Sequence, residues 1–236
     1  MIKEIEVYVM KNKLWWMFIL FCILPLAGFI TITYLVTNGR VLPLDEALLN
    51  MVKPLESASF TKFMNFFSHL GSTGPVIVLS CIFLAILFIL YRKKDEVLLF
   101  VIVSLGSTGM NQALKFVFKR ERPFEQLIAE NGFSYPSGHT MAAVSLYGIV
   151  TFLFWRHVKK VWGRILLIVL STLMISLIGF SRVYLRVHYP SDIVAAFCVS
   201  GMWLFITIWI YQYVKEKRYE KRQDLEKEGS SNFRKE

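Results

Sequence analysis

The sequence is poor in cysteine and in acidic residues, and each shortage excludes a class of protein. It has three cysteines in 236 residues, and 17 acidic residues against 27 basic ones. Cys22, Cys81 and Cys198 lie in separate apolar runs without CxxC spacing, which excludes a disulfide framework and predicts free, buried thiols. The sequence also lacks the His/Cys and paired-carboxylate spacings of zinc and calcium sites, so it offers no metal-binding motif.

Charged residues of both signs make up only 19% of the chain, whereas 55% of the residues are apolar and the mean hydropathy is +0.50. This composition excludes a soluble domain, whose surface must be mostly polar, and predicts a membrane protein. The formal net charge of +10 would suit a nucleic-acid partner. Because the basic residues lie between long apolar runs, we expect no nucleic-acid partner and attribute the charge to membrane topology.

Mostly apolar runs of about 20 residues, long enough to cross roughly 30 Å of hydrocarbon, occur six times. They span residues 14–36, 74–91, 97–118, 139–155, 162–180 and 191–213. The first exceeds the roughly 7 to 15 residues of a signal-peptide core, so it should remain as an anchor. Because hydrocarbon cannot satisfy exposed backbone groups, the sequence predicts an all-α integral membrane protein, a bundle of six transmembrane helices.

The distribution of lysine and arginine predicts the orientation of this bundle, since cytoplasmic loops carry the excess of these residues. Eighteen of the 27 lie in residues 1–13, 92–94 and 156–164 and in the tail from 215 onward. We therefore expect a plasma-membrane protein with both termini cytoplasmic. We expect one domain over residues 1–213, followed by a charged, solvated and partly helical cytoplasmic tail over residues 214–236.

The outer side has fewer basic residues, but six of them crowd around two short segments: Lys115, Lys119, Arg120, Arg122, Arg182 and Arg186. The long outer loop, residues 37–73, has apolar positions at Leu44, Ala47, Leu48, Met51 and Val52. These positions predict a short amphipathic helix, which either lies at the membrane interface beside the lipid entry path or packs over the bundle.

Two outward-facing segments concentrate groups that can hold an anion. In the first, Lys115, Lys119 and Arg122 would share one side of the third helix if that helix continued. The second, Pro136-Ser137-Gly138-His139, is typical of a helix start. The helix that follows runs inward, so its positive end and free amides face the outer surface. Gly138 lets the backbone approach a ligand closely.

A third outward-facing segment adds Arg182, His188 and Asp192. Pro190 fits the first turn of the sixth helix, so Asp192 can reach back to His188, fix its tautomer and stabilise an imidazolium. Cations, free amides, two histidines and a carboxylate suit a phosphoryl group in transfer, for which electrostatic positioning supplies most of the catalysis. The three segments therefore predict an active site for phosphate chemistry at the outer membrane face.

The patterns KxxxxxxRP, PSGH and SRxxxxxHxxxD resemble the type 2 phosphatidic acid phosphatase superfamily. This family includes bacterial lipid phosphate phosphatases and undecaprenyl pyrophosphate phosphatases. Eleven fixed positions are met in order: Lys115, Arg122, Pro123, Pro136, Ser137, Gly138, His139, Ser181, Arg182, His188 and Asp192. The motifs cover residues 115–192, and the six-span layout extends the resemblance over most of the chain.

The resemblance implies hydrolysis of a terminal phosphate from a lipid phosphate or pyrophosphate, without a metal or other cofactor. His188 would attack phosphorus and form a phosphohistidine, His139 would protonate the leaving lipid oxygen, and Asp192 would orient His188. The groups that would hold the phosphoryl oxygens are Lys115, Arg122, Ser137, Gly138 and Arg182.

Two other functions stay open: a phosphotransferase that uses the same site with an alcohol acceptor, and a transporter that holds an anionic lipid without cleaving it. Lys119, Arg120 and Arg186 fall outside the motifs, and we expect them to contact lipid headgroups. The expected partners are the lipid phosphate substrate and membrane lipids, and the sequence indicates no oligomeric state. No motif distinguishes undecaprenyl pyrophosphate, phosphatidylglycerol phosphate, phosphatidate and diacylglycerol pyrophosphate, so all four remain candidate substrates.

Overall fold

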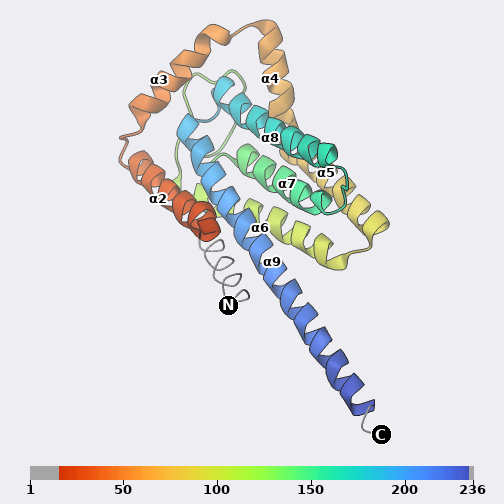
Figure 1. The fold of residues 1–236 in the computed structure, drawn as a ribbon. Coiled ribbons are helices and arrows are strands. Elements are labelled where there is room, and N and C mark those ends of the chain that lie inside the picture. Colours follow the sequence, from red (N-terminus) through yellow and green to blue (C-terminus); the bar gives the residue numbers. More distant parts are fainter. Residues whose placement is uncertain (1–15, 234–236) are drawn as a thin grey trace.

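The computed structural model describes residues 16–233, except the side chains of residues 90, 91, 224 and 226–233. All regular structure in residues 16–233 is helical (Figure 1). Five helices are long and apolar enough to cross a membrane, and a bent pair, Ala58–Leu70 with Thr73–Ile89, makes up to six. The predicted all-α membrane fold is therefore confirmed, with the second span bent by 54° against the helix before it.

The first span, two further helices and a short turn lie between residues 16 and 70. They are a π-helical turn, η1 (Ile19–Ile23), then α2 (Leu24–Thr37), α3 (Leu42–Val52), a short 3-10 turn, η2 (Lys53–Leu55), and α4 (Ala58–Leu70). The span itself covers Trp16–Thr37, and residues 14 and 15 of the predicted run lie outside the described residues. Ser57 caps α4, because its hydroxyl accepts a hydrogen bond from the Phe60 amide (3.3 Å).

The short helix predicted in the outer loop is α3. Four of its five predicted apolar positions are exposed, whereas Val52 packs against the cluster of Met64 and Tyr184. Leu44 is 60% exposed and Met51 is 71% exposed, whereas Val41, Asp45 and Leu49, spaced four residues apart, are buried. Exposed apolar side chains on this face are typical of a helix in contact with lipid. The opposite face of α3 packs over the end of the bundle, against α8 (Val161–Tyr184) and α9 (Pro190–Phe233). Packing over the bundle, one of the two alternatives, is therefore confirmed for the buried face, and a place beside the lipid entry path stays a prediction.

The remaining helices complete the bundle. They are α5 (Thr73–Ile86), a π-helical turn, η3 (Leu87–Tyr91), then α6 (Lys94–Phe118), α7 (Gly138–Trp155), α8 (Val161–Tyr184) and α9 (Pro190–Phe233). Helix α9 has 44 residues and continues through residue 213 without a break. At about 1.5 Å per residue it is roughly 66 Å long, which is more than twice the thickness of the hydrocarbon layer.

Helix α7 lies at the centre of the bundle and packs against α6, α8 and α9. Half of its span is buried, compared with 6% for Trp16–Thr37. Its C-terminal half forms an apolar cluster with α6 and η3, built from Leu87, Leu99, Phe100, Val103, Leu146, Ile149, Val150 and Leu153. Gly106 lets α6 and α9 approach each other, since a Cβ there would lie 2.2 Å from Cζ2 of Trp203.

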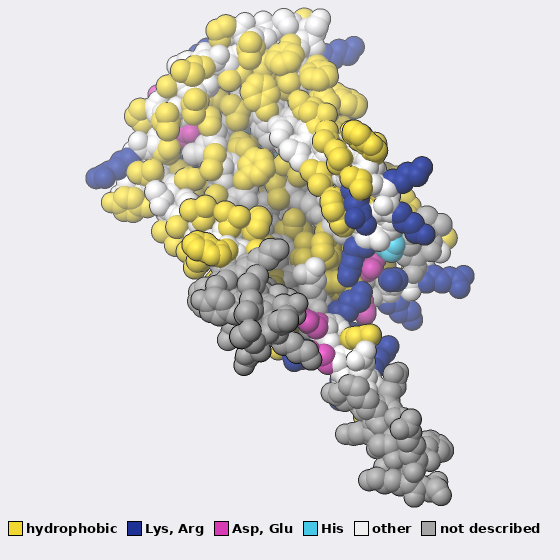
Figure 2. Space-filling view, viewed as in Figure 1, with side chains coloured by type: hydrophobic (Ala, Val, Ile, Leu, Met, Phe, Trp, Pro, Cys, Tyr) yellow, Lys and Arg dark blue, Asp and Glu magenta, His cyan; other side chains and the backbone are white. Residues whose placement is uncertain are grey.

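The two ends of the bundle differ in charge. In Figure 2 dark blue lysine and arginine side chains gather at the end that holds the α5–α6 and α7–α8 turns, and hydrophobic side chains cover the helices between the ends. The opposite end, at the top of Figure 1, holds α3, the loop between α6 and α7, the end of α8 and the start of α9. All three cysteines are unpaired, but only Cys22 is buried, so the prediction of a buried thiol is wrong for Cys81, which is exposed.

Candidate active site

The first cationic group comes from the end of α6 and the loop after it. Lys115 lies in the last turn of α6, and Lys119, with φ of 47°, ends the helix. Arg122 therefore lies in the loop and not on a continued helical face. Its Nε donates to the carbonyl of Gly132 (3.0 Å), and its Nη1 donates to the carbonyl of Val187 (2.7 Å). These backbone bonds hold the guanidinium group beside the segment that carries His188.

Arg182, in the last turn of α8, supplies the second cationic group and is only 1% exposed. Its Nη1 donates to the hydroxyl of Ser68 on α4, and its Nη2 donates to Oε1 of Glu130 (2.6 Å). The other oxygen of Glu130 lies 3.5 Å from Nη2 of Arg122, so one carboxylate joins both arginines. Among the described residues, Nε of Arg182 has no hydrogen-bond partner although it is buried. Lys115 is close enough to interact electrostatically with both arginines.

Glu130 is charged in this position. Burial acts to raise its pKa, but the charge of Arg182 and its hydrogen bond, together with the charges of His139 and Arg122, lower the pKa below the usual 4.5. The carboxylate therefore competes with any other anion for the same guanidinium N–H groups.

The start of α7 faces these cations. Ser137 is the N-cap residue, and its hydroxyl accepts a hydrogen bond from the hydroxyl of Thr140 (3.0 Å). The amides of Gly138 and His139 belong to the first turn, where N–H groups lack acceptors within the helix. A Cβ at Gly138 would lie 2.9 Å from Oδ1 of Asn111. Close packing against α6 is thus a reason for this glycine that the sequence does not reveal.

His188 and Asp192 form a buried pair, 1% and 0% exposed. Nδ1 of His188 lies 3.3 Å from Oδ2 of Asp192, and its Nε2 lies 3.3 Å from Nη1 of Arg122. Since a carboxylate accepts and a guanidinium donates, we assign the proton to Nδ1 and a lone pair to Nε2. Burial, followed by the positive charges of Arg182 and Arg122, holds the pKa of His188 well below 6.5, so the imidazole is neutral at pH 7.

His139 completes the cluster from the first turn of α7. It interacts electrostatically with Arg182, Glu130, His188 and Lys115. The structure thus brings together all eight residues named from the sequence. They come from α6, the loop between α6 and α7, α7, α8, the loop between α8 and α9, and α9. Among residues 16–233, no group of three or more histidine, cysteine or acidic residues has the arrangement of a metal site.

Two of the three arginines and lysines assigned to headgroup contact have other partners. Arg120 donates to Asp192 (2.6 Å) and to Asp45 (2.7 Å), and Arg186 pairs with Glu56 and Glu125. The headgroup prediction is therefore wrong for both arginines. A sequence motif does not reveal which carboxylates lie beside a loop arginine.

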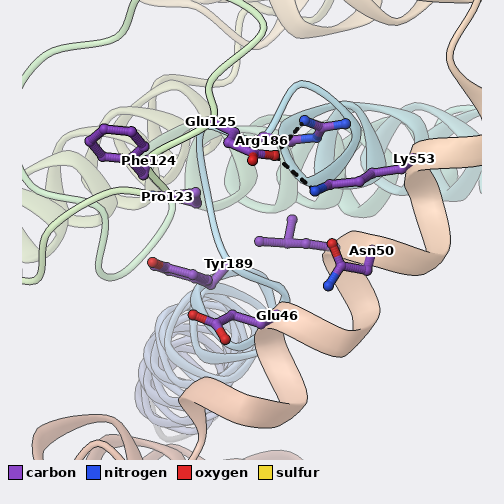
Figure 3. A pocket seen from close by; sticks show the side chains of 9 residues that line it. Glu46, Asn50, Lys53, Pro123, Phe124, Glu125, Arg186 and Tyr189 are labelled. Carbon is purple, nitrogen blue, oxygen red and sulfur yellow. Dashed lines mark hydrogen bonds and ion pairs between the residues drawn. The ribbon is translucent and has the colours of Figure 1, made fainter.

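Two cavities open beside the site. The first has a volume of about 410 Å³ and reaches Arg122 and the carboxylate of Glu130; its lining consists of Glu121, Arg122, Pro123, Phe124, Gln126, Glu130, Asn131, Gly132 and Phe133. The second, about 280 Å³, lies between α3 and the loops. Figure 3 shows Lys53 and Arg186 reaching Glu125 on one side of it, with Tyr189 and Glu46 on the other.

The comparisons with known proteins agree with this geometry. A family model described as the PAP2 superfamily matches residues 96–216, which is more than half of the chain. The chain belongs to the PAP2 superfamily. The matched part of this PAP2 chain begins in the first turn of α6 and ends in α9, so it contains all eight site residues.

Named PAP2 relatives and a solved structure cover most of the chain. Phosphatidylglycerophosphatase B of Bacillus subtilis is 29% identical over 192 residues, which are 80% of this chain and 94% of the relative. An undecaprenyl-diphosphatase of Sulfolobus acidocaldarius is 25% identical over 207 residues, 85% of this chain and 92% of the relative. A crystal structure of a transmembrane PAP2-type phosphatidylglycerolphosphate phosphatase from Bacillus subtilis superposes with a TM-score of 0.75 at 25% identity, covering 80% and 96% of the two chains.

Four residues of this PAP2 site escaped the sequence analysis: Asp45, Ser68, Arg120 and Glu130. Asp45 and Ser68 lie outside the residues matched by the family model. The spacing of Asp45 was one indication in the sequence, because it lies four residues from both Val41 and Leu49 and so shares their face of α3, which is buried. A lone acidic residue on such a face usually has a buried partner. Glu130 lies in a polar loop without periodicity, and no pattern could have identified it.

Proposed function

We propose that this protein hydrolyses the terminal phosphate of a lipid phosphate or lipid pyrophosphate at the outer face of the membrane. The observation that carries the proposal is the environment of His188. Its Nδ1 faces the buried carboxylate of Asp192, and its Nε2 faces the guanidinium group of Arg122. An imidazole whose Nε2 lone pair faces an anion-binding group is arranged to attack phosphorus once a phosphoryl group takes over the N–H of that group.

The cationic groups would bind the phosphoryl oxygens. Nε of Arg182 is a buried donor without an acceptor among the described residues, and a phosphoryl oxygen would supply one. Arg122 and Lys115 would neutralise the other oxygens, and the amides at the start of α7 would add donors at the positive end of the helix. Glu130 would have to give up its hydrogen bond to Arg182 as the phosphoryl group entered.

In the first chemical step, Nε2 of His188 attacks phosphorus and the bond from phosphorus to the leaving oxygen breaks. The imidazole becomes positively charged, and Asp192 stabilises this charge through Nδ1–H. His139, in its protonated form, gives a proton to the leaving oxygen. The products are the dephosphorylated lipid and a phosphohistidine at His188.

In the second step water attacks the phosphohistidine. His139, now neutral, accepts a proton from the water, and the phosphorus–nitrogen bond breaks. Inorganic phosphate leaves, and both histidines return to their starting states. The chain supplies every acid, base and cation in this scheme, so no step uses a metal or cofactor.

The class of substrate follows from the site and the relatives together. The Bacillus relative is named a phosphatidylglycerophosphatase and the Sulfolobus relative an undecaprenyl-diphosphatase. Each enzyme is named for a lipid substrate that ends in phosphate. The open cavity beside Arg122 and Glu130 would give a terminal phosphate access to the site. Phosphatidylglycerol phosphate, phosphatidate, diacylglycerol pyrophosphate and undecaprenyl pyrophosphate are therefore the lipids to compare.

The decisive experiment measures phosphate release by the purified protein from these four lipids in mixed micelles. Loss of the nucleophile in His188→Ala should abolish release, and loss of the general acid in His139→Ala should slow it by about 10² to 10⁴. His69→Ala is the matched control, because His69 is exposed on α4 and lies outside the site. If His188→Ala kept wild-type turnover, the mechanism would be wrong.

Two further readouts separate the competing functions. Substrate labelled at the terminal phosphate should leave an acid-labile label on the wild-type protein and none on His188→Ala. Release of inorganic phosphate in step with the dephosphorylated lipid supports hydrolysis, whereas labelled phosphate on a second alcohol supports transfer. Binding of the lipid without turnover or labelled protein supports a carrier.

We also propose that the protein lies in the plasma membrane with both termini cytoplasmic. The basic turns between α5 and α6 and between α7 and α8 support this orientation. The active site is at the other end of the bundle, beside the outer leaflet. Residues 1–213 would form the membrane domain, and residues 214–236 a cytoplasmic tail that continues α9.

A further inference from the structure

A buried acidic residue outside the PAP2 match, Asp45, is bound to the start of the helix that carries the catalytic carboxylate. Asp45 lies in the first turn of α3 and is 1% exposed. Its Oδ1 accepts a hydrogen bond from the amide of Ser191 (2.9 Å), and its Oδ2 accepts one from the Ser191 hydroxyl (2.6 Å). Oδ2 also accepts from Nη2 of Arg120 (2.7 Å).

Arg120 connects this carboxylate to Asp192. Its Nη1 donates to Oδ1 of Asp192 (2.6 Å) and to the hydroxyl of Ser191 (2.7 Å). The guanidinium carbon lies 4.1 Å from the centre of the Tyr189 ring, so the group is also stacked. These contacts fix the guanidinium plane, because each Nη is held by a different carboxylate.

The two oxygens of Asp192 consequently have separate partners. Oδ1 is held by Arg120, and Oδ2 accepts from the amide of Tyr189 (3.0 Å) and lies 3.3 Å from Nδ1 of His188. A carboxylate without the bond to Arg120 could rotate about its Cβ–Cγ bond and lose its alignment with the imidazole. Arg120 thus acts at the side of Asp192 that the histidine does not touch.

The charges of Asp45, Arg120 and Asp192 also suggest that Asp45 and Arg120 act on His188. Asp45, Arg120 and Asp192 together carry one net negative charge in a buried region. When His188 attacks phosphorus its imidazole gains a positive charge, and this net negative charge compensates it. Replacing Asp45 by a neutral residue would remove the surplus negative charge while leaving the catalytic pair in place.

We infer that Arg120 and Asp45 are positioning residues that align and charge-balance Asp192, and through it His188. The inference rests on the proposed function and adds to it a connection from the outer helix α3 to the nucleophile. The alternative is that the same contacts only anchor α3 to α9. The two roles differ in whether Arg120 acts through Asp192.

A double-mutant cycle distinguishes these roles. Arg120→Lys keeps the charge but cannot hold both carboxylates. It should lower kcat about 10- to 100-fold and change KM less than about threefold, because the loss falls on the reaction and not on binding. Asp192→Asn alone should lower kcat at least as much. The kcat of the double variant should lie within about threefold of the kcat of Asp192→Asn. If Arg120 acts through Asp192, its replacement costs little once Asp192 has been changed.

The chain offers a matched control in Arg186. This arginine also bridges two carboxylates, Glu56 and Glu125, and its side chain is 12% exposed, as is that of Arg120. Arg186→Lys should leave kcat within about twofold of wild type. Size-exclusion chromatography and thermal unfolding of each variant show whether it folds. If Arg120→Lys does not fold, Asp45→Asn, which is nearly isosteric, takes its place in the cycle with an expected loss of about 5- to 20-fold in kcat.

Each outcome is decisive. Losses that multiply in the double variant, or equal losses in Arg120→Lys and Arg186→Lys, overturn the positioning role and leave lipid hydrolysis standing. Full kcat in both Arg120→Lys and Asp45→Asn overturns it as well. Absence of turnover in wild type and Arg186→Lys alike overturns the proposed function, and the positioning role with it.

Discussion

The carboxylate of Glu130 occupies donors that the proposed phosphate site needs, which leads to an unusual prediction for Glu130→Gln. Glu130 accepts from Nη2 of Arg182 (2.6 Å) and lies 3.5 Å from Nη2 of Arg122. A phosphoryl group held by the same arginines must displace it. Replacing Glu130 by a neutral amide of the same shape should therefore tighten the binding of phosphate.

The size of the effect follows from the exposure of the pair. A hydrogen bond between charged groups contributes about 1.5 to 3 kcal/mol. The Glu130 side chain is 26% exposed, and the glutamine amide can still accept a weaker bond, so we reduce the expected gain to about 1 kcal/mol. This corresponds to an inhibition constant for inorganic phosphate about fivefold lower than in wild type, with KM lowered by a similar factor.

The assay is competitive inhibition of lipid phosphate hydrolysis by inorganic phosphate. The control is Glu125→Gln, because Glu125 also binds two basic residues, Lys53 (2.8 Å) and Arg186 (3.1 Å), away from the histidines. It should leave the inhibition constant unchanged. Weaker phosphate inhibition in Glu130→Gln would refute the reasoning, since Glu130 would then be organising the arginines and not competing for them.

Three further predictions test the topology, the packing and the nucleophile. The orientation can be tested by adding single cysteines to a variant without the native ones. A membrane-impermeant thiol reagent outside intact cells should label Lys53→Cys and not Lys160→Cys. Labelling of Lys160→Cys alone would show that the protein has the opposite orientation. Gly138→Ala should lower both the thermal unfolding temperature and kcat, because its methyl group would lie 2.9 Å from Oδ1 of Asn111. Adding Asn111→Ala should recover part of the loss. An unchanged kcat in Gly138→Ala would contradict the proposed close packing. The pKa of His188, measured by NMR on histidine-labelled protein and assigned with His188→Ala, should lie well below 6.5, because burial and then Arg182 and Arg122 disfavour the imidazolium. A midpoint at or above pH 6.5 would contradict the assigned environment.

The membrane fold and the motif residues could be predicted because both leave a strong local signal. A run of about 20 mostly apolar residues is required by the thickness of the hydrocarbon layer, so five spans could be predicted one by one. The second run could be read too, but its 54° angle to α4 is set by contacts with other helices and leaves no local signal. His139, His188 and Asp192 were identifiable because each lies at the end of a span.

The partners of these residues could not be predicted, for a physical reason. Asp45 lies 147 residues before Asp192 in the chain, and Arg120 joins the two only after α3 has folded over the start of α9. Their pairing depends on tertiary packing, and it has no periodicity that a sequence can display. For the same reason the sequence alone predicted that Arg120 contacts lipid headgroups, whereas in the structure it binds two carboxylates.

Helix α4 links the arginine at the site to the lipid around the protein. Ser68 on this helix accepts a hydrogen bond from Arg182, while Phe63 and Phe66 of the same helix are 46% and 57% exposed. Helix α4 meets α5 at 54°, and membrane helices can adjust to a thinner or thicker bilayer by changing their tilt. We expect turnover to vary with acyl-chain length in the host membrane, so that the thickness of the bilayer itself regulates how well the phosphate is held.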